Sequence, residues 1–382
     1  MDGCEFRPSA GPPSGLTIAA VTDTQPLFVF DGHTDAPTRL WEAPADLREV
    51  CPDRHVDLPR LRRGGVSGLV FAFFVPAHFS PEDGLAHAEA LHRLTVEQMR
   101  PGELELVTSP EEVAAAVARG GVAVVFGLEN GRPLSVPGAL ERLLAMGVRL
   151  VTLTHFGSHE WCDAAGDDEI HGGLTSEGEE IVRRLNRAGV IVDVSHVSDR
   201  AVEHVLAVSE APVIASHSSA RALCDHPRNV TDDLARAIAR RGGVVMANAF
   251  PVFLDPQADR ANRERMAHLR EPMQALQEAY AARPRDLAVA RAQLLAPYLQ
   301  PPVPLSTFVD HVMHLVGVVG PEGVGIGTDF DGIPETPIGF EDVSRFSDLV
   351  AALRGRGLDE AALRQVMGES FRRVWRQVAA RR

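Results

Sequence analysis

The sequence contains no lysine, so all 38 basic residues of the 382-residue chain are arginines. This absence excludes Schiff-base lysines, lysine-anchored pyridoxal phosphate, the Walker A phosphate loop and the protein-kinase lysine. It also excludes a carbamylated lysine as the bridge between two metal ions, a common device in barrel hydrolases. Any fixed side-chain cation that binds a substrate carboxylate must therefore be an arginine.

Other deficits narrow the class of protein further. The four cysteines are too few and too scattered for a disulfide scaffold. The net charge of -14, with no clustered basic face, argues against nucleic acid as the main partner. The first residues lack a basic segment followed by an apolar one, and no apolar run reaches ~18 residues. We therefore expect a cytoplasmic protein with no membrane partner.

Short apolar runs, bounded by glycine, proline or polar residues, recur along the chain. They are rich in Val, Ile and Phe and are continuous rather than alternating, which is typical of strands buried on both faces of a parallel sheet. These runs predict strands at residues 27–30, 68–75, 122–128, 149–154, 190–195, 212–216, 242–248 and 323–328.

Helical patterns lie between most of these runs. Ser109 predicts an N-cap, with a proline and two glutamates in the turn that follows. Gly120, Gly147 and Gly189 are predicted to end their helices. The clearest helical patterns cover residues 109–120, 137–147, 175–189, 198–208 and 231–243.

Eight strands that alternate with helices favour an α/β fold of the (β/α)8 TIM-barrel type over an open doubly wound sheet. Residues 1–26 read as an irregular lead-in, and residues 27–382 as a single barrel domain. Residues 252–305 interrupt the alternation of strands and helices before the last strand. Their Arg/Ala/Leu-rich composition predicts a helical insertion with a mostly solvated face rather than a separate domain.

Polar, chemically active residues follow most of the predicted strands. In a barrel of this type the active site is at the carboxyl ends of the strands. Six of the eight predicted strands lead into a His, Asp or Glu, and a seventh ends at an asparagine. In strand order, the residues singled out are His33 with Asp35, Glu129, His155, His196, His217, Asn248 and Asp329.

This combination of histidines and carboxylates predicts a divalent metal site, with zinc the first candidate. His33 and Asp35 lie two residues apart, so their side chains point to one side of a strand. His196 and His217 are one βα unit apart and are expected on adjacent strands. The ligands outnumber those of one tetrahedral zinc, which suggests two ions. With no lysine available, Glu129 is the best candidate for the bridge between them.

Other candidates have simpler explanations. Cys162 and Cys224 belong to no CxxC pair and are expected to be buried as small apolar residues. His311 and His314 fall on a helical pattern and are expected to be structural. Five more histidines are expected to be hydrogen-bonded loop residues: His55, His78, His159, His171 and His226.

The chain resembles the membrane (renal) dipeptidases, peptidase family M19, which are binuclear zinc dipeptidases on a TIM barrel. The insertion at 252–305 is similar to that of the bacterial branch. The resemblance runs in family order from residue 27 onward and is specific. The matching stretches are DGHTDAP (31–37), GLENG (127–131), LTH (153–155), GLTSEGEEIVRRLNRAGVIVDVSHVSD (173–199), PVIASHSSARALCDHPRNVTDD (212–233), GGVVMAN (242–248) and GIGTDFDG (325–332).

The resemblance implies a role for each matched residue. The metal ligands are the set already chosen from the spacing: His33 and Asp35 for one zinc, His196 and His217 for the other, and Glu129 between them. Among the remaining residues, His155 would contact the scissile group and Asp329 would transfer the proton. Arg228 would bind the substrate carboxylate, and Asn248 would also contact the substrate.

Phe74 and Phe250 stand where the family often has tyrosine, so its usual substrate preference does not transfer directly. The first hypothesis is a dipeptidase, with a D-residue accepted at the C-terminal position. The second is another binuclear metal amidohydrolase, acting on N-acyl amino acids, lactams or lactones. A non-catalytic metal-binding barrel is the third, although the complete set of active residues argues against it. A homodimer is left open.

Overall fold

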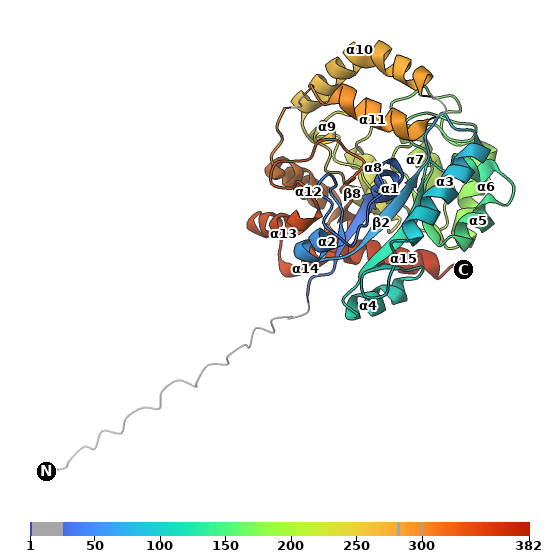
Figure 1. The fold of residues 1–382 in the computed structure, drawn as a ribbon. Helices are drawn as coiled ribbons and strands as arrows, with labels where there is room; N and C mark the ends of the chain where they lie inside the picture. Colours follow the sequence, from blue (N-terminus) through green and yellow to red (C-terminus); the bar gives the residue numbers. More distant parts are fainter. Residues whose placement is uncertain (2–25, 281–282, 299–300) are drawn as a thin grey trace.

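The strands form a closed parallel barrel (Figure 1). The computed structural model describes residues 1, 26–280, 283–298 and 301–382, so the predicted lead-in lies almost wholly outside the described residues. Neighbouring strands pair in the order β2-β1-β9-β8-β7-β6-β5-β4, and the pairing of β2 with β4 closes the ring. The strands are β1 (Val29–Thr34), β2 (Val66–Phe74), β3 (Leu104–Leu106), β4 (Val122–Glu129), β5 (Val148–Thr152), β6 (Ile191–Asp193), β7 (Ile214–Ala215), β8 (Val244–Ala247) and β9 (Val324–Ile326).

The predicted TIM barrel of eight strands is confirmed, with two corrections to the strand assignments. The first strand was predicted to end at residue 30, but β1 continues through Thr34 because Asp31 pairs with Leu69 and Ile326 of its two neighbours. The short strand β3 was not predicted. It pairs with the first residues of β4 alone and lies outside the ring.

Helices follow the strands around the barrel. Those after β4 to β7 agree with the predicted patterns to within a few residues. The helices are α1 (Ala36–Glu42), α2 (Leu58–Gly64), α3 (Pro81–Val96), α4 (Pro110–Ala118), α5 (Ala139–Ala145), α6 (Ser176–Arg187), α7 (Asp199–Val208), α8 (Asp232–Arg240), α9 (Pro251–Leu254), α10 (Pro256–Ala279), α11 (Pro284–Leu295), α12 (Leu305–Val319), α13 (Phe346–Gly355), α14 (Glu360–Arg364) and α15 (Ser370–Ala379).

The predicted helix ends are largely correct. Gly120, Gly147 and Gly189 all have positive φ, between 65° and 90°, just past the ends of α4, α5 and α6. Ser109 occupies the N-cap position of α4, but its side chain makes no capping hydrogen bond. Instead, the side chain of Glu112 accepts the backbone N–H of Thr108 at 2.7 Å, so the first turn is closed by the glutamate.

Apolar side chains fill the barrel below its carboxyl end. Phe30, Val125 and Ile214 belong to one buried cluster that extends to α15. The ring of Phe371 on α15 stacks on Phe30 with ring centroids 4.2 Å apart, and Trp375 is also buried there. A second buried cluster lies between the strands and the surrounding helices. The interior of the barrel is therefore filled by side chains, and a reactive site is expected at its carboxyl end.

The predicted insertion forms helices α9, α10 and α11, which lie at the top of the molecule in Figure 1. Most residues of α10 are exposed, as its composition predicted. Helix α11 packs toward α1, where the guanidinium of Arg285 lies 5.2 Å above the ring of Trp41. Since α1 follows directly from β1, the insertion covers the side of the barrel on which the strands end.

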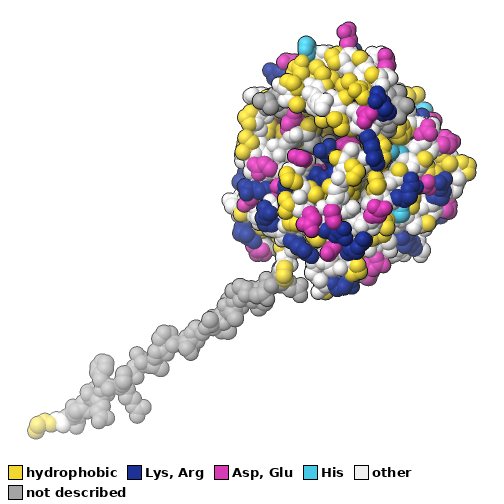
Figure 2. All heavy atoms as spheres, viewed as in Figure 1, with side chains coloured by type: hydrophobic (Ala, Val, Ile, Leu, Met, Phe, Trp, Pro, Cys, Tyr) yellow, Lys and Arg dark blue, Asp and Glu magenta, His cyan; other side chains and the backbone are white. Residues whose placement is uncertain are grey.

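No helix in the described part of the chain is long and apolar enough to cross a membrane. On the face drawn in Figure 2, arginine and acidic side chains are interspersed among apolar ones.

Candidate metal centre

The residues predicted from the strand ends converge on one side of the barrel. His33 is in β1, Glu129 is the last residue of β4, and Asn248 follows β8 directly. His155, His196, His217 and Asp329 each lie two or three residues beyond their strands. Three groups of buried or half-buried side chains each bring their ligand atoms within 4.8 Å of one another: His33 with Asp193 and His217, Glu129 with His155 and His196, and His33 with Asp35 and Asp329.

Glu129 lies at the centre of the cluster, and its two carboxylate oxygens face different histidines. Oε2 is 3.3 Å from Nε2 of His33. Oε1 is 3.2 Å from Nε2 of His196 and 3.5 Å from Nε2 of His217. Nε2 of His33 is also 3.6 Å from Oδ2 of Asp35. The arrangement is that of a carboxylate between two ligand pairs.

The side chains fit bound cations. His33 is fully buried; its Nδ1 has no hydrogen-bond partner among the described residues, and its Nε2 faces the carboxylates of Glu129 and Asp35. A Cβ atom on Gly332 would lie 2.3 Å from Oδ2 of Asp35 and 2.7 Å from Oδ1 of Asp329. Any residue other than glycine would therefore displace one or both carboxylates. Buried imidazole nitrogens beside carboxylate oxygens are the donor set of zinc and related divalent ions.

Burial and the crowding of charges shift the titration of this cluster. Burial, reinforced by the carboxylates of Asp35 and Glu129, raises the pKa of Asp329 to about 7. Burial lowers the pKa of His33, but Glu129 and Asp35 outweigh it and raise that pKa well above its usual value. Burial and the nearby Arg228 lower the pKa of His155 to about 3. Strongly perturbed groups that lie together are typical of functional sites.

Backbone strain is concentrated at the same place. In the described part of the chain, four non-glycine residues have φ between 66° and 73°. Each such residue costs about 1–3 kcal/mol unless its surroundings compensate. All four either are predicted site residues or lie within two residues of one: Asn130, His196, Asp329 and Asp331.

Arg228 lies on the loop before α8 and is buried beside the cluster. Its Nη1 donates to the hydroxyl of Ser218 at 3.3 Å and its Nη2 to the carbonyl of His217 at 3.2 Å. Its Nε has no hydrogen-bond partner among the described residues, and the guanidinium lies 5.4 Å above the ring of Phe253. Burial lowers its pKa to about 10, so the group remains a cation at neutral pH. It retains a donor for an anionic ligand.

Aromatic rings contact the histidines of the cluster and lie beside it. The ring of His155 contacts Phe74 and Phe156 edge-on, with centroids 4.6 and 4.7 Å apart. Phe156 is half exposed and also lies 5.1 Å from the ring of His196. Phe250 is the N-cap residue of α9 and contacts Phe253. Apolar rings therefore pack against the ligand cluster, and Phe156 is the most exposed of them.

The other singled-out residues lie elsewhere. His311 is buried on α12, where it accepts the N–H of Ala220 and its Nε2 is 2.9 Å from the carbonyl of Leu254. His314, on the same helix, pairs with Asp232 at 2.8 Å. Cys162 and Cys224 are buried free thiols. These structural predictions are confirmed.

Sequence reasoning missed two buried carboxylates. Asp31 accepts the N–H and the hydroxyl of Thr328 at 2.8 and 2.6 Å and so joins β1 to β9. Asp193, at the end of β6, lies under the cluster within reach of His33 and His217. Asp193 lies inside the run at 190–195, which was predicted only as a strand, and an acidic residue inside such a run was the available signal. Asp31 directly follows the first predicted strand, but no role was assigned to it.

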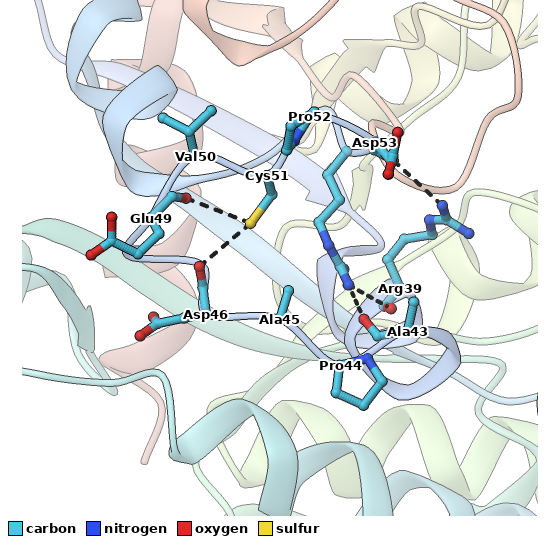
Figure 3. Close-up of a pocket in the computed structure, with 11 residues that line it drawn as sticks. Arg39, Ala43, Pro44, Ala45, Asp46, Glu49, Val50, Cys51, Pro52 and Asp53 are labelled. Carbon is cyan, nitrogen blue, oxygen red and sulfur yellow. Dashed lines mark hydrogen bonds between the residues drawn. The ribbon is translucent and has the colours of Figure 1, made fainter.

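A separate cavity of about 310 Å³ lies at the loop after α1 (Figure 3). None of the predicted site residues lines it. The thiol of Cys51 points to the carbonyl oxygens of Asp46 and Glu49, at 3.4 and 3.5 Å. Its walls carry both acidic side chains and arginines, with no convergent set of metal ligands. The histidine–carboxylate cluster is therefore the candidate site.

Comparisons with known proteins agree with this assignment. The family described as Membrane dipeptidase (Peptidase family M19) matches residues 18–382. Dipeptidase verJ of Clonostachys rogersoniana is 32% identical over 91% of this chain and 83% of its own length. An uncharacterised dipeptidase of Schizosaccharomyces pombe is 30% identical over 91% of this chain and 80% of its own.

Solved structures show the same fold. The probable dipeptidase PvdM of Pseudomonas aeruginosa has a TM-score of 0.79 at 27% identity, covering 93% of this chain and 96% of its own. A Rhodobacter sphaeroides metallopeptidase has a TM-score of 0.75 at 25% identity, covering 93% and 100%. Fungal and bacterial relatives match alike, so they do not single out the bacterial branch. With its fold, its cluster of candidate metal ligands and a match along nearly its whole length, the chain belongs to the membrane dipeptidase family, peptidase family M19.

Proposed function

We propose that this protein is a binuclear zinc dipeptidase that hydrolyses the single peptide bond of dipeptides. The observation that carries the proposal is the position of Glu129, with one oxygen 3.3 Å from His33 and the other 3.2 Å from His196. In this assignment His33 and Asp35 would hold one ion, His196 and His217 would hold the other, and Glu129 would contribute an oxygen to each. Two bound zinc ions supply Lewis acidity and a hydroxide nucleophile at neutral pH.

Asp329 is the proton-transfer residue in this proposal. Its carboxyl group lies with His33 and Asp35 in one of the three ligand groups, so it is placed both to take a proton at the centre and to return it. The amide of Asn248 donates to Oδ2 of Asp329 at 3.0 Å, which leaves Oδ1 to take the proton of the attacking water and give it to the leaving amine. Asn248 thus serves the reaction by orienting this carboxyl group.

Arg228 binds the C-terminal carboxylate of the substrate. Its guanidinium is buried, charged and held by Ser218 and His217, with Nε still available. A rigid arginine fork matches the geometry of a carboxylate. Because Arg228 hydrogen-bonds to the backbone of His217 itself, it fixes the carboxylate close to the reacting bond and so limits the substrate to very short peptides. His155, whose ring centroid lies 4.3 Å from that of His196, contacts the scissile group.

The stereochemical preference is a further part of the proposal. The Rhodobacter sphaeroides relative was crystallised with a phosphinate mimic of the dipeptide L-Ala-D-Ala. We infer that this protein also accepts a D-residue at the C-terminal position. Apolar contact with Phe74 and Phe156 favours dipeptides whose side chains are themselves apolar.

A substrate panel tests the proposal. Zinc-loaded protein is given L,L- and L,D-dipeptides, tripeptides, N-acyl amino acids, lactams and lactones at equal concentration. We expect turnover of dipeptides, including L,D-dipeptides, and little turnover of tripeptides. Turnover confined to the N-acyl amino acids, lactams or lactones would replace the dipeptidase with another binuclear amidohydrolase.

A further inference from the structure

A layer of buried polar side chains lies directly beneath the metal centre, at the carboxyl ends of the adjacent strands β5, β6 and β7. Asp193 is fully buried and occupies the middle of this layer. Its Oδ2 accepts the hydroxyls of Thr152 and Ser216, both at 2.6 Å. Its Oδ1 accepts the backbone N–H groups of Ser195 at 3.0 Å and Ser216 at 2.8 Å.

These four hydrogen bonds decide what Asp193 can do. Its carboxylate is close enough to His33 and His217 to be considered as a metal ligand. Each of its oxygens, however, already accepts two hydrogen bonds, which use the lone pairs that a metal would need. Its effect on the metal centre must therefore pass through a neighbour.

Ser216 is that neighbour. Its hydroxyl oxygen is 2.7 Å from Nδ1 of His217. A serine hydroxyl has one hydrogen, and a carboxylate has none to give, so the hydrogen of Ser216 goes to Asp193. The hydroxyl oxygen of Ser216 then accepts the N–H of Nδ1. This arrangement leaves the lone pair of His217 on Nε2, the nitrogen 3.5 Å from Glu129.

The support is specific to His217. Nδ1 of His33 and Nδ1 of His196 have no hydrogen-bond partner within the described chain. In each of the three histidines assigned to the metals, Nε2 faces Glu129 and Nδ1 is the outer nitrogen. Among the described residues, only the Nδ1 of His217 is held by a side chain. Such outer contacts fix the tautomer and the ring orientation of a metal ligand and change metal affinity by about 10–100-fold when they are lost.

We propose that Asp193 and Ser216 are positioning residues that set the tautomer and orientation of His217 for metal binding. The inference rests on the metal centre of the proposed function. It assigns to the pair no contact with substrate and no part in proton transfer. Its consequence is an asymmetric centre. One of the two metal positions depends on the hydrogen-bond relay from Asp193 through Ser216 to His217, and the other does not.

Zinc affinity, measured without substrate by competition with a chromophoric chelator, tests the proposal. Ser216→Ala should bind one of its two zinc ions about 10–100-fold more weakly than the wild type, while the other ion is unaffected. Ser216→Thr keeps the hydroxyl and should restore most of the affinity. Thr152→Val is the matched control, because it removes a hydroxyl from the same carboxylate oxygen without touching a histidine, and it should change zinc affinity by less than about threefold.

The outcomes are distinguishable. If Ser216→Ala binds both ions as tightly as the wild type, or if Thr152→Val weakens zinc as much as Ser216→Ala does, the relay is wrong while the dipeptidase assignment stands. If wild-type protein itself binds fewer than two zinc ions, the proposed function fails instead. Nitrogen NMR of zinc-loaded wild-type protein gives a test that needs no variant: we expect the His217 proton on Nδ1, and a proton on Nε2 would overturn the proposal.

Discussion

The side-chain amide of Asn248 donates a 3.0 Å hydrogen bond to Oδ2 of Asp329, joining two residues that are 81 positions apart in the sequence. Asn248 follows β8 directly, and Asp329 lies three residues beyond β9, the neighbouring strand. The backbone of Asp329 is left-handed, with φ of 66°. The barrel thus holds this carboxyl group beside His33 and Asp35, on a strained backbone.

Replacing Asp329 by asparagine should abolish most of the catalysis without emptying the metal centre. Asparagine keeps the size of the side chain but cannot carry the proton, so kcat should fall by about 10²–10⁴-fold. Zinc content per chain should stay the same. Asp331→Asn is the control, because Asp331 is buried on the same loop but pairs with the backbone of His55 instead. Unchanged kcat in Asp329→Asn would remove the residue from the proton-transfer role.

Arg228→Gln should raise KM for dipeptides by about 10–100-fold, the loss expected from removing a hydrogen bond between charged groups. Dipeptides with an amidated C-terminus provide the control, since they lack the carboxylate. The wild type should discriminate strongly between the acid and the amide, and the variant should not. A variant that still prefers the acid as strongly as the wild type would show that another group binds the carboxylate.

Gly332→Ala should weaken zinc binding and activity together. Its Cβ would lie within 2.7 Å of carboxylate oxygens of both Asp35 and Asp329, so one or both must move. Gly317→Ala, on the exposed surface of α12 with no atom within 4 Å of the added carbon, is the control and should leave zinc affinity unchanged. Calorimetric titration of both variants with zinc measures the difference. Equal affinities in the two variants would contradict the prediction.

The stability of the protein should fall as the solution is acidified, partly through His311. Burial lowers the pKa of this histidine to about 4, whereas in the unfolded chain it is about 6.5. Its contribution is fully present above pH 6.5 and is lost as the pH falls toward 4, because the unfolded chain takes up the proton first. His311→Gln should make the loss between pH 6.5 and 5 smaller by about 1–2 kcal/mol in urea unfolding. Identical pH dependence in both proteins would contradict this.

Much of the site could be predicted from the sequence, because the polar residues follow the strands directly and the fold brings all the strand ends together. In a parallel barrel every strand ends on the same side, so polar residues after Val-rich runs must meet there. His33, Glu129 and His217 were found in this way. The absence of lysine also pointed to Glu129 as the bridge.

Other features depend on tertiary contacts. Asp193 sits inside an apolar run, and the hydrogen bonds that define its position come from neighbouring strands. The three residues of β3 are too short a pattern to distinguish from a loop, and they form a strand because β4 lies beside them. Ser109 has the sequence features of an N-cap residue, yet its side chain makes no capping hydrogen bond. The side chain that bonds to the backbone at this helix start is Glu112, which accepts the N–H of Thr108. Positive φ at His196 is imposed by the site and has no local sequence signal.

Zinc titration of metal-free protein, with dipeptide hydrolysis followed at each addition, tests the central claim most directly. The account predicts that activity rises until two equivalents of zinc are bound per chain and then stays constant. Glu129→Gln should fail to reach two equivalents, whereas Glu105→Gln, which removes a buried carboxylate paired with Arg119 far from the centre, should behave as the wild type does. Full dipeptidase activity at one equivalent, or none at two, would contradict the binuclear dipeptidase.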